Sequence, residues 1–61
     1  MIHDYAMIAR WAAKVEGKRV RNVTRGFWPN TVLITFTDST FACLDAAEIE
    51  ALREAAQEVP A

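Results

Sequence analysis

The sequence predicts a small α+β domain in which a helix, a three-stranded antiparallel meander and a second helix follow one another, with both helices on one face of the sheet. Apolar residues recur at helical spacing near both ends of the chain, alternate along residues 31–37, and are interrupted by short turn segments. At 61 residues the chain is expected to form one domain, 1–61, with residues 58–61 frayed.

The first helix is expected to begin after Asp4, because an Asp side chain accepts hydrogen bonds from the free N–H groups of a first helical turn. Its apolar face consists of Tyr5, Ile8, Trp11 (or Ala12) and Val15. Gly17 is expected to end the helix, since glycine readily adopts the left-handed conformation found just past a helix terminus.

A first strand is expected over residues 18–24, KRVRNVT. Its two apolar positions, Val20 and Val23, are three residues apart rather than two, which indicates a β-bulge. Which side of this strand is buried stays open. Residues 25–30, RGFWPN, form a connection, because glycine permits positive φ and proline lacks the N–H that a strand ladder needs.

The clearest strand covers residues 31–37, TVLITFT, in which threonines alternate with apolar side chains. Asp38-Ser39 predicts a two-residue turn into a third strand over residues 40–44, although Ser stands where Gly is more usual. In this register Phe36 lies opposite Phe41 and Ile34 lies opposite Cys43, while the threonines point to the other face of the sheet.

This register divides the sheet into a covered and an open face. The face expected beneath the helices carries Val32, Ile34, Phe36, Phe41 and Cys43. The open face carries Leu44 and the candidate oligomer face, which consists of Leu33, Thr35, Thr37, Thr40 and Ala42. Such a half-apolar face is a common place for a second copy to dock.

The last helix has the strongest local signals. Asp45-Ala-Ala-Glu48 has the spacing of a capping box, in which each of the two acidic side chains accepts a hydrogen bond from the backbone N–H of the other. The apolar stripe behind it consists of Ile49, Leu52, Ala56 and Val59.

A chain of this length has a small core, and natural domains of such size are commonly reinforced by a disulfide, a metal or a partner. Cys43 is the only cysteine, which excludes an intrachain disulfide. His3 is the only histidine, so a His/Cys metal cluster would need more than one chain. Association is therefore expected, most often as a homodimer.

The same scarcity of reactive side chains argues against catalysis. No second histidine shares acid–base work with His3, and Cys43 is expected in the core. Glu50 and Glu54 have the spacing of a solvated helix face, and the sequence holds no glycine-rich phosphate loop. We therefore expect no enzyme activity and no cofactor.

Charge is distributed unevenly, since a formal net charge of −1 combines a basic middle segment with an acidic C-terminal half. Arginine forks bind phosphates and carboxylates, and an exposed Trp supplies contact area in interfaces or stacks on a base. The candidate partner- or anion-binding residues are Lys18, Arg19, Arg21, Arg25, Phe27 and Trp28. A structural interpretation stays open, in which Trp28 folds onto the core and arginines pair with Glu48 or Glu54.

Residues 17–23 (GKRVRNV), the aromatic loop and residues 32–38 (VLITFTD) resemble the glycine-started hairpins of small phage-encoded accessory proteins, including anti-CRISPR and other anti-defence inhibitors. The resemblance covers about half of the chain, and Ser39 stands where Gly normally follows the Asp. It implies a stoichiometric binder that blocks a host protein or sequesters a nucleotide signal, rather than a catalyst.

The sequence thus predicts a non-enzymatic inhibitor that occupies a protein partner, plausibly of the phage anti-defence type. The alternative is a binder of anionic nucleotides or nucleic acid through the same basic strand and aromatic loop. The first is favoured because nucleic-acid binders are usually basic overall. With no signal peptide and no apolar run of membrane-spanning length, a cytoplasmic location is expected, in the host if the protein is phage-encoded.

Overall fold

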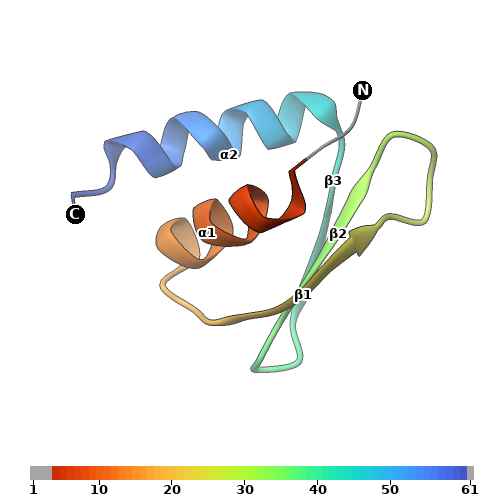
Figure 1. Ribbon diagram of the computed structural model, residues 1–61, viewed down its shortest axis with the longest axis horizontal. Helices are drawn as coiled ribbons and strands as arrows, with labels where there is room; N and C mark the ends of the chain where they lie inside the picture. Colours follow the sequence, from red (N-terminus) through yellow and green to blue (C-terminus); the bar gives the residue numbers. More distant parts are fainter. Residues whose placement is uncertain (1–3, 61) are drawn as a thin grey trace.

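The structure, a computed structural model, describes residues 4–60 and confirms the predicted α+β architecture. The elements are α1 (Tyr5–Glu16), β1 (Val20–Arg25), β2 (Val32–Phe36), β3 (Phe41–Leu44) and α2 (Ala46–Glu58). The strands form one antiparallel sheet in the order β1-β2-β3, and both helices lie on the same face of it (Figure 1).

Local signals define both ends of α1, as expected. The Asp4 carboxylate accepts hydrogen bonds from the N–H groups of Ala6 and Met7, at 3.1 and 3.3 Å. Gly17 ends the helix in the left-handed region with φ 67°. One expectation for this helix is wrong: Tyr5, placed on the buried face, is 39% exposed, because the covered face centres on Ile8 and Ala12.

The predicted capping box of α2 is present. The N–H of Glu48 donates to Asp45 Oδ1 at 2.9 Å, and the N–H of Asp45 donates to Glu48 Oε1 at 3.1 Å. The helix continues through Glu58, the first of the four residues expected to fray. Ala61 lies outside the described residues.

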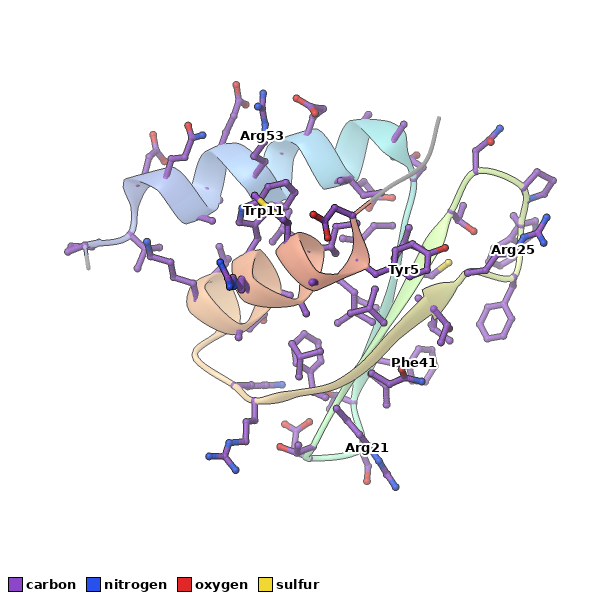
Figure 2. The ribbon with its side chains drawn as sticks, viewed as in Figure 1. Tyr5, Trp11, Arg21, Arg25, Phe41 and Arg53 are labelled. Carbon is purple, nitrogen blue, oxygen red and sulfur yellow. The ribbon has the colours of Figure 1, made fainter. Side chains whose placement is uncertain are left out.

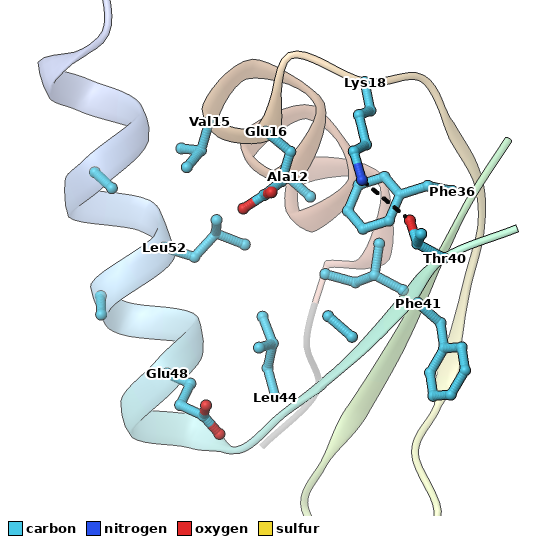
Figure 3. A pocket seen from close by; sticks show the side chains of 14 residues that line it. Ala12, Val15, Glu16, Lys18, Phe36, Thr40, Phe41, Leu44, Glu48 and Leu52 are labelled. Atoms are coloured by element: carbon cyan, nitrogen blue, oxygen red, sulfur yellow. Dashed lines mark hydrogen bonds between the residues drawn. The ribbon is translucent and has the colours of Figure 1, made fainter. Parts of the chain in front are cut away.

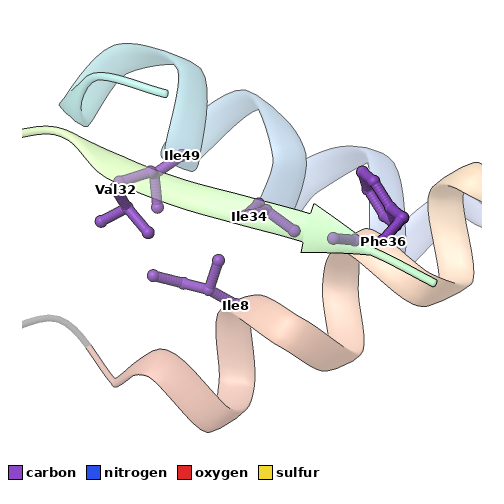
Figure 4. Packing of buried hydrophobic residues seen from close by; sticks show 6 residues of the cluster. Ile8, Val32, Ile34, Phe36 and Ile49 are labelled. Atoms are coloured by element: carbon purple, nitrogen blue, oxygen red, sulfur yellow. The ribbon is translucent and has the colours of Figure 1, made fainter. Parts of the chain in front are cut away.

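The core lies between the central strand β2 and the two helices. Among residues 4–60 the buried hydrophobic side chains are Ile8, Ala12, Val32, Ile34, Phe36, Ile49 and Ala56. Figure 4 shows alternate side chains of β2 pointing toward Ile8 of α1 and Ile49 of α2. Because successive strand residues point to opposite faces, the intervening residues of β2 stay only half-buried on the other side.

The expected bulge in β1 is present at Arg21. Val20 pairs with Phe36, yet Asn22 pairs with Thr35, so Arg21 is the extra residue on this strand. The bulge lets Val20 and Val23 both pack against the core in spite of their spacing.

The turn between β2 and β3 differs from the prediction, because it holds three residues, 37–39, rather than two. The N–H of Phe36 donates to the carbonyl of Thr40 at 2.9 Å, and the N–H of Ser39 donates to the carbonyl of Phe36 at 3.1 Å. Ser39 has φ 74°, in the left-handed region. A three-residue hairpin loop has this geometry when its last residue is left-handed.

The longer turn moves the register of β3 by one residue, so every β3 side chain changes face. Thr35 pairs with Phe41 and Ile34 pairs with Ala42. Phe41 and Cys43 therefore lie on the open face, where Phe41 is 66% exposed, and their predicted place in the core is wrong.

The one-residue shift of β3 also divides the candidate oligomer face between the two sides of the sheet. Thr40, Ala42 and Leu44 lie on the helix side of the sheet, and Thr37 lies in the turn. The open face carries two rows of side chains. One row is Thr24, Leu33 and Cys43; the other is Asn22, Thr35 and Phe41.

We predict that Ser39→Gly stabilises the domain by about 1 kcal/mol, because glycine adopts positive φ without the steric cost that a Cβ brings. Thr37→Gly in the same turn is the control, and it should lower stability through chain entropy. Urea denaturation measures both changes. A loss of stability in Ser39→Gly equal to that in Thr37→Gly would contradict the assigned turn.

Candidate binding surface at the aromatic loop

The connection between β1 and β2, residues 26–31, is here called the aromatic loop, and its backbone is closed by hydrogen bonds. The N–H of Gly26 donates to the carbonyl of Thr31 at 2.9 Å, at the base of the loop. At the tip, the N–H of Thr31 donates to the carbonyl of Trp28 at 3.3 Å. Pro29 and Asn30 lie between them, and Asn30 has φ 61°. Pro followed by a positive-φ residue is typical of a type II turn.

The Thr31 side chain fixes the backbone of Trp28 from both sides. Its hydroxyl accepts a hydrogen bond from the Trp28 N–H at 3.2 Å and donates one to the Trp28 carbonyl at 2.5 Å. At the base, a Cβ on Gly26 would lie 2.1 Å from Thr31 Oγ1 and 3.0 Å from Cys43 Sγ. Only glycine fits at this position. The close packing at the base and the hydrogen bonds at the tip together give the loop a defined shape.

This defined loop exposes two large aromatic side chains. Phe27 is 69% and Trp28 65% exposed, and their rings pack edge to face with centroids 6.0 Å apart. The interpretation in which Trp28 folds onto the core is therefore wrong. An edge-to-face pair contributes about 0.5–1.5 kcal/mol beyond area burial, which restricts the two rings relative to each other.

Phe41 is a further exposed aromatic residue, and its place on the surface was not predicted from the sequence. It lies on the open face in the row farther from the aromatic loop, at the end of the sheet where Arg21 also projects (Figure 2). The sequence carries no signal that decides the place of Phe41, because Asp38-Ser39 fits a three-residue turn as well as a two-residue one.

The Lys18 side chain contacts the hairpin turn between β2 and β3. Its Nζ lies 3.0 Å from Asp38 Oδ2 and 3.2 Å from Thr40 Oγ1, and it lies over the Phe36 ring at 5.4 Å from the centroid. The hydroxyl of Thr40 and the ammonium of Lys18 donate hydrogen bonds that lower the pKa of Asp38 to about 2.

The remaining basic residues of this segment, Arg19, Arg21 and Arg25, are exposed. Within residues 4–60, none of them lies within ion-pair distance of a carboxylate, so Arg21 and Arg25 do not pair with Glu48 or Glu54 of the same chain, which was one of the alternatives left open. Arg21 and Arg25 lie at opposite ends of β1 (Figure 2). Four residues of strand separate their Cα atoms by about 13 Å, and the two side chains lie apart in this conformation.

The part of the chain that the structure describes holds neither a metal-binding cluster nor a membrane-spanning helix. It contains no group of three His, Cys, Asp or Glu side chains arranged to hold a metal ion. His3 lies outside the described residues. Neither described helix is long and apolar enough to cross a membrane.

No protein-family model matches the chain, and no curated protein or solved structure is significantly similar to it.

We predict that Thr31→Val destabilises the domain by about 1 kcal/mol and speeds hydrogen exchange at the Trp28 amide, because the loop loses both hydroxyl bonds. Thr35→Val makes the same exchange of hydroxyl for methyl on the open face and should leave that amide unchanged. Exchange measured by NMR distinguishes the two variants. Equal protection of the Trp28 amide in wild type and Thr31→Val would contradict the assigned role of Thr31.

We predict that Asp38 contributes to the loss of stability in acid. Because its folded pKa is about 2, below the ordinary 3.8, its contribution is present above pH 5 and is lost as the pH falls toward 2. Asp38→Asn should therefore unfold more readily than wild type at pH 7, and the difference should shrink at pH 2. Urea denaturation at both values, with Glu54→Gln as the control, tests this; an unchanged difference contradicts it.

Proposed function

We propose that the chain is a non-enzymatic binding protein that occupies a protein partner stoichiometrically through the aromatic loop and the arginines of β1. The observation that carries this proposal is the exposure of Phe27 and Trp28 on a loop whose backbone is fixed by hydrogen bonds. Burying a large apolar side chain stabilises a protein by about 1.5–3 kcal/mol. This domain has a small core, yet it leaves both Phe27 and Trp28 exposed and so lacks the stabilisation that their burial would give.

The fixed loop suits recognition because little conformational entropy is lost on binding. Ordering a mobile side chain at an interface costs about 0.5–1.5 kcal/mol, and a loop with its shape already set avoids much of that cost. Trp is also among the residues that dominate measured binding energies. Phe27 and Trp28 would therefore form the desolvated centre of the interface.

The arginines would surround this centre rather than form it. Arg25 directly precedes the aromatic loop, Arg21 lies near the other end of β1, and Arg19 comes just before the strand. Exposed charges at the rim of an interface mainly raise the association rate and orient the partner. An acidic patch on the partner would match this strip of β1.

The nucleotide-binding alternative has weaker support, because Arg21 and Arg25 do not converge on one point. Lys18 is also engaged with Asp38, so one of the four basic groups first assigned to this surface is already neutralised. Within the protein-binding proposal, the resemblance to anti-defence inhibitors favours a host-defence or nucleic-acid-processing protein as the class of partner, met in the host cytoplasm.

The test is a comparison of partner capture by matched variants. Wild-type chain immobilised at moderate salt should retain one protein from host lysate, and purified partner should then bind Trp28→Ala at least 30-fold more weakly, a loss of about 2 kcal/mol. Arg53→Ala is the control, because Arg53 pairs with Glu50 on α2, 2.9 Å away, and should bind normally. Circular dichroism verifies that each variant folds.

Salt separates the two classes of ligand. Phosphate-driven binding through three arginines should weaken about 20- to 40-fold between 50 and 200 mM salt, whereas the affinity of an aromatic-centred protein interface changes little. Unchanged partner affinity in Trp28→Ala contradicts the proposal. Trp28 fluorescence that is quenched by an oligonucleotide at low salt only, with loss in Arg19→Ala/Arg21→Ala, supports the nucleic-acid alternative instead.

A further inference from the structure

The two edges of the sheet differ in how they are protected against pairing. The edge strand β1 carries a bulge at Arg21, flanked by Arg19 and Arg25, and bulges and charges both discourage another strand from adding. The edge strand β3, FACL, has no charge, no proline and a regular register throughout Phe41–Leu44. An unprotected apolar edge is where a further strand adds.

The turn determines which backbone groups this edge offers. In an antiparallel ladder, alternate residues direct their N–H and C=O groups to the same neighbour. The bond from Phe36 N–H to the Thr40 carbonyl shows that even-numbered residues of β3 face β2. The N–H and C=O groups of Phe41 and Cys43 therefore point outward, away from β2.

An apolar groove of about 460 Å³ runs beside this edge, on the helix side of the sheet (Figure 3). It exists because α2 packs mainly on α1 and contacts β3 only sparsely. Most of its lining is apolar and includes Val15, Ala42, Leu44, Ala51, Leu52 and Ala55, and the charged residues Glu16, Lys18 and Glu48 also line it. Leu44 and Leu52 point into the groove, while the Phe41 ring projects away from it.

We propose that this edge and groove bind a second copy of the chain, through antiparallel pairing of the two β3 strands about a two-fold axis at Ala42. Phe41 of each copy then pairs with Cys43 of the other, and their outward N–H and C=O groups satisfy one another. The two sheets become one of six strands. This dimer surface differs from the oligomer face expected on the sequence.

The second copy is the occupant because β3 is complementary to itself in three respects. The residues whose N–H and C=O groups point outward, Phe41 and Cys43, lie on either side of Ala42. A two-fold axis at Ala42 therefore places Phe41 of one copy opposite Cys43 of the other. Ala42 then faces its own copy in the non-hydrogen-bonded position, where Cα atoms approach to about 4.5 Å and a small side chain fits. The uncharged, apolar strand also matches an apolar groove.

The dimer also covers side chains that the monomer leaves exposed. On the open face, Phe41 of one copy lies beside Cys43 of the other. On the helix side, Leu44 of each copy lies beside Thr40 of the other, at the groove. Ala51 and Ala55 carry small side chains on the groove side of α2, which permit the two α2 helices to approach. None of this uses Phe27 or Trp28, so the proposal stands apart from the proposed function.

Disulfide cross-linking tests the pairing directly. In Ala42→Cys/Cys43→Ala, the two new thiols lie across the axis, and the Cα separation of about 4.5 Å is within the range for a disulfide. Mild oxidation should yield a covalent dimer of twice the 6.9 kDa chain at least tenfold faster than in the control, Asn22→Cys/Cys43→Ala, whose thiol lies on β1. Equal rates in both overturn the proposal.

Light scattering on unmodified chain provides a second measurement that does not depend on the new cysteine. Wild type at 100 µM should have the dimer mass, and Phe41→Lys, at an exposed position, should shift it to the monomer mass without loss of helix signal. Trp28→Ala should remain a dimer, which separates this result from failure of the proposed function. A wild type that stays monomeric at 1 mM overturns the proposal.

Discussion

The left-handed residue at position 39 determines how the rest of the sheet is used. Because Ser39 takes a conformation that usually belongs to glycine, the hairpin turn has three residues, and β3 enters the sheet one residue later than a two-residue turn would place it. Asp38 accepts hydrogen bonds from the backbone and hydroxyl of Thr40, and Lys18 reaches from the start of β1 to pair with Asp38. This cluster stabilises the turn, and the length of the turn sets which alternate side chains of β3 face the helices.

The helices, the bulge and the order of the elements could be predicted because their signals are local. Asp4, Gly17 and the Asp45–Glu48 pair act within a few residues of themselves. The turn could not be assigned with equal security, since both turn lengths suit Asp-Ser and the choice depends on a φ value that composition does not determine. A turn predicted one residue too short assigns every β3 side chain to the wrong face of the sheet, because strand side chains alternate between the two faces.

The candidate site was predictable in composition but not in geometry. Lys18 looks like its basic neighbours in the sequence, and only the fold shows that Asp38, distant in the chain, neutralises it. Trp28 could equally have packed inward. Its exposure follows from the Thr31 hydroxyl, which binds the Trp28 backbone and turns the chain at the loop tip. Interactions of this kind depend on the folded path of the chain rather than on residue pattern.

In the aromatic loop, the residues that the backbone path requires differ from the residues whose side chains are exposed. Its base admits only glycine at position 26, and its turn requires the φ angles of Pro29 and Asn30, whereas the side chains of Phe27 and Trp28 make no hydrogen bond on which the loop path depends. Exchange of those two side chains would therefore alter the chemistry of the tip while the frame stayed the same. Substitutions at these two positions can consequently change the surface of the loop tip without refolding the loop.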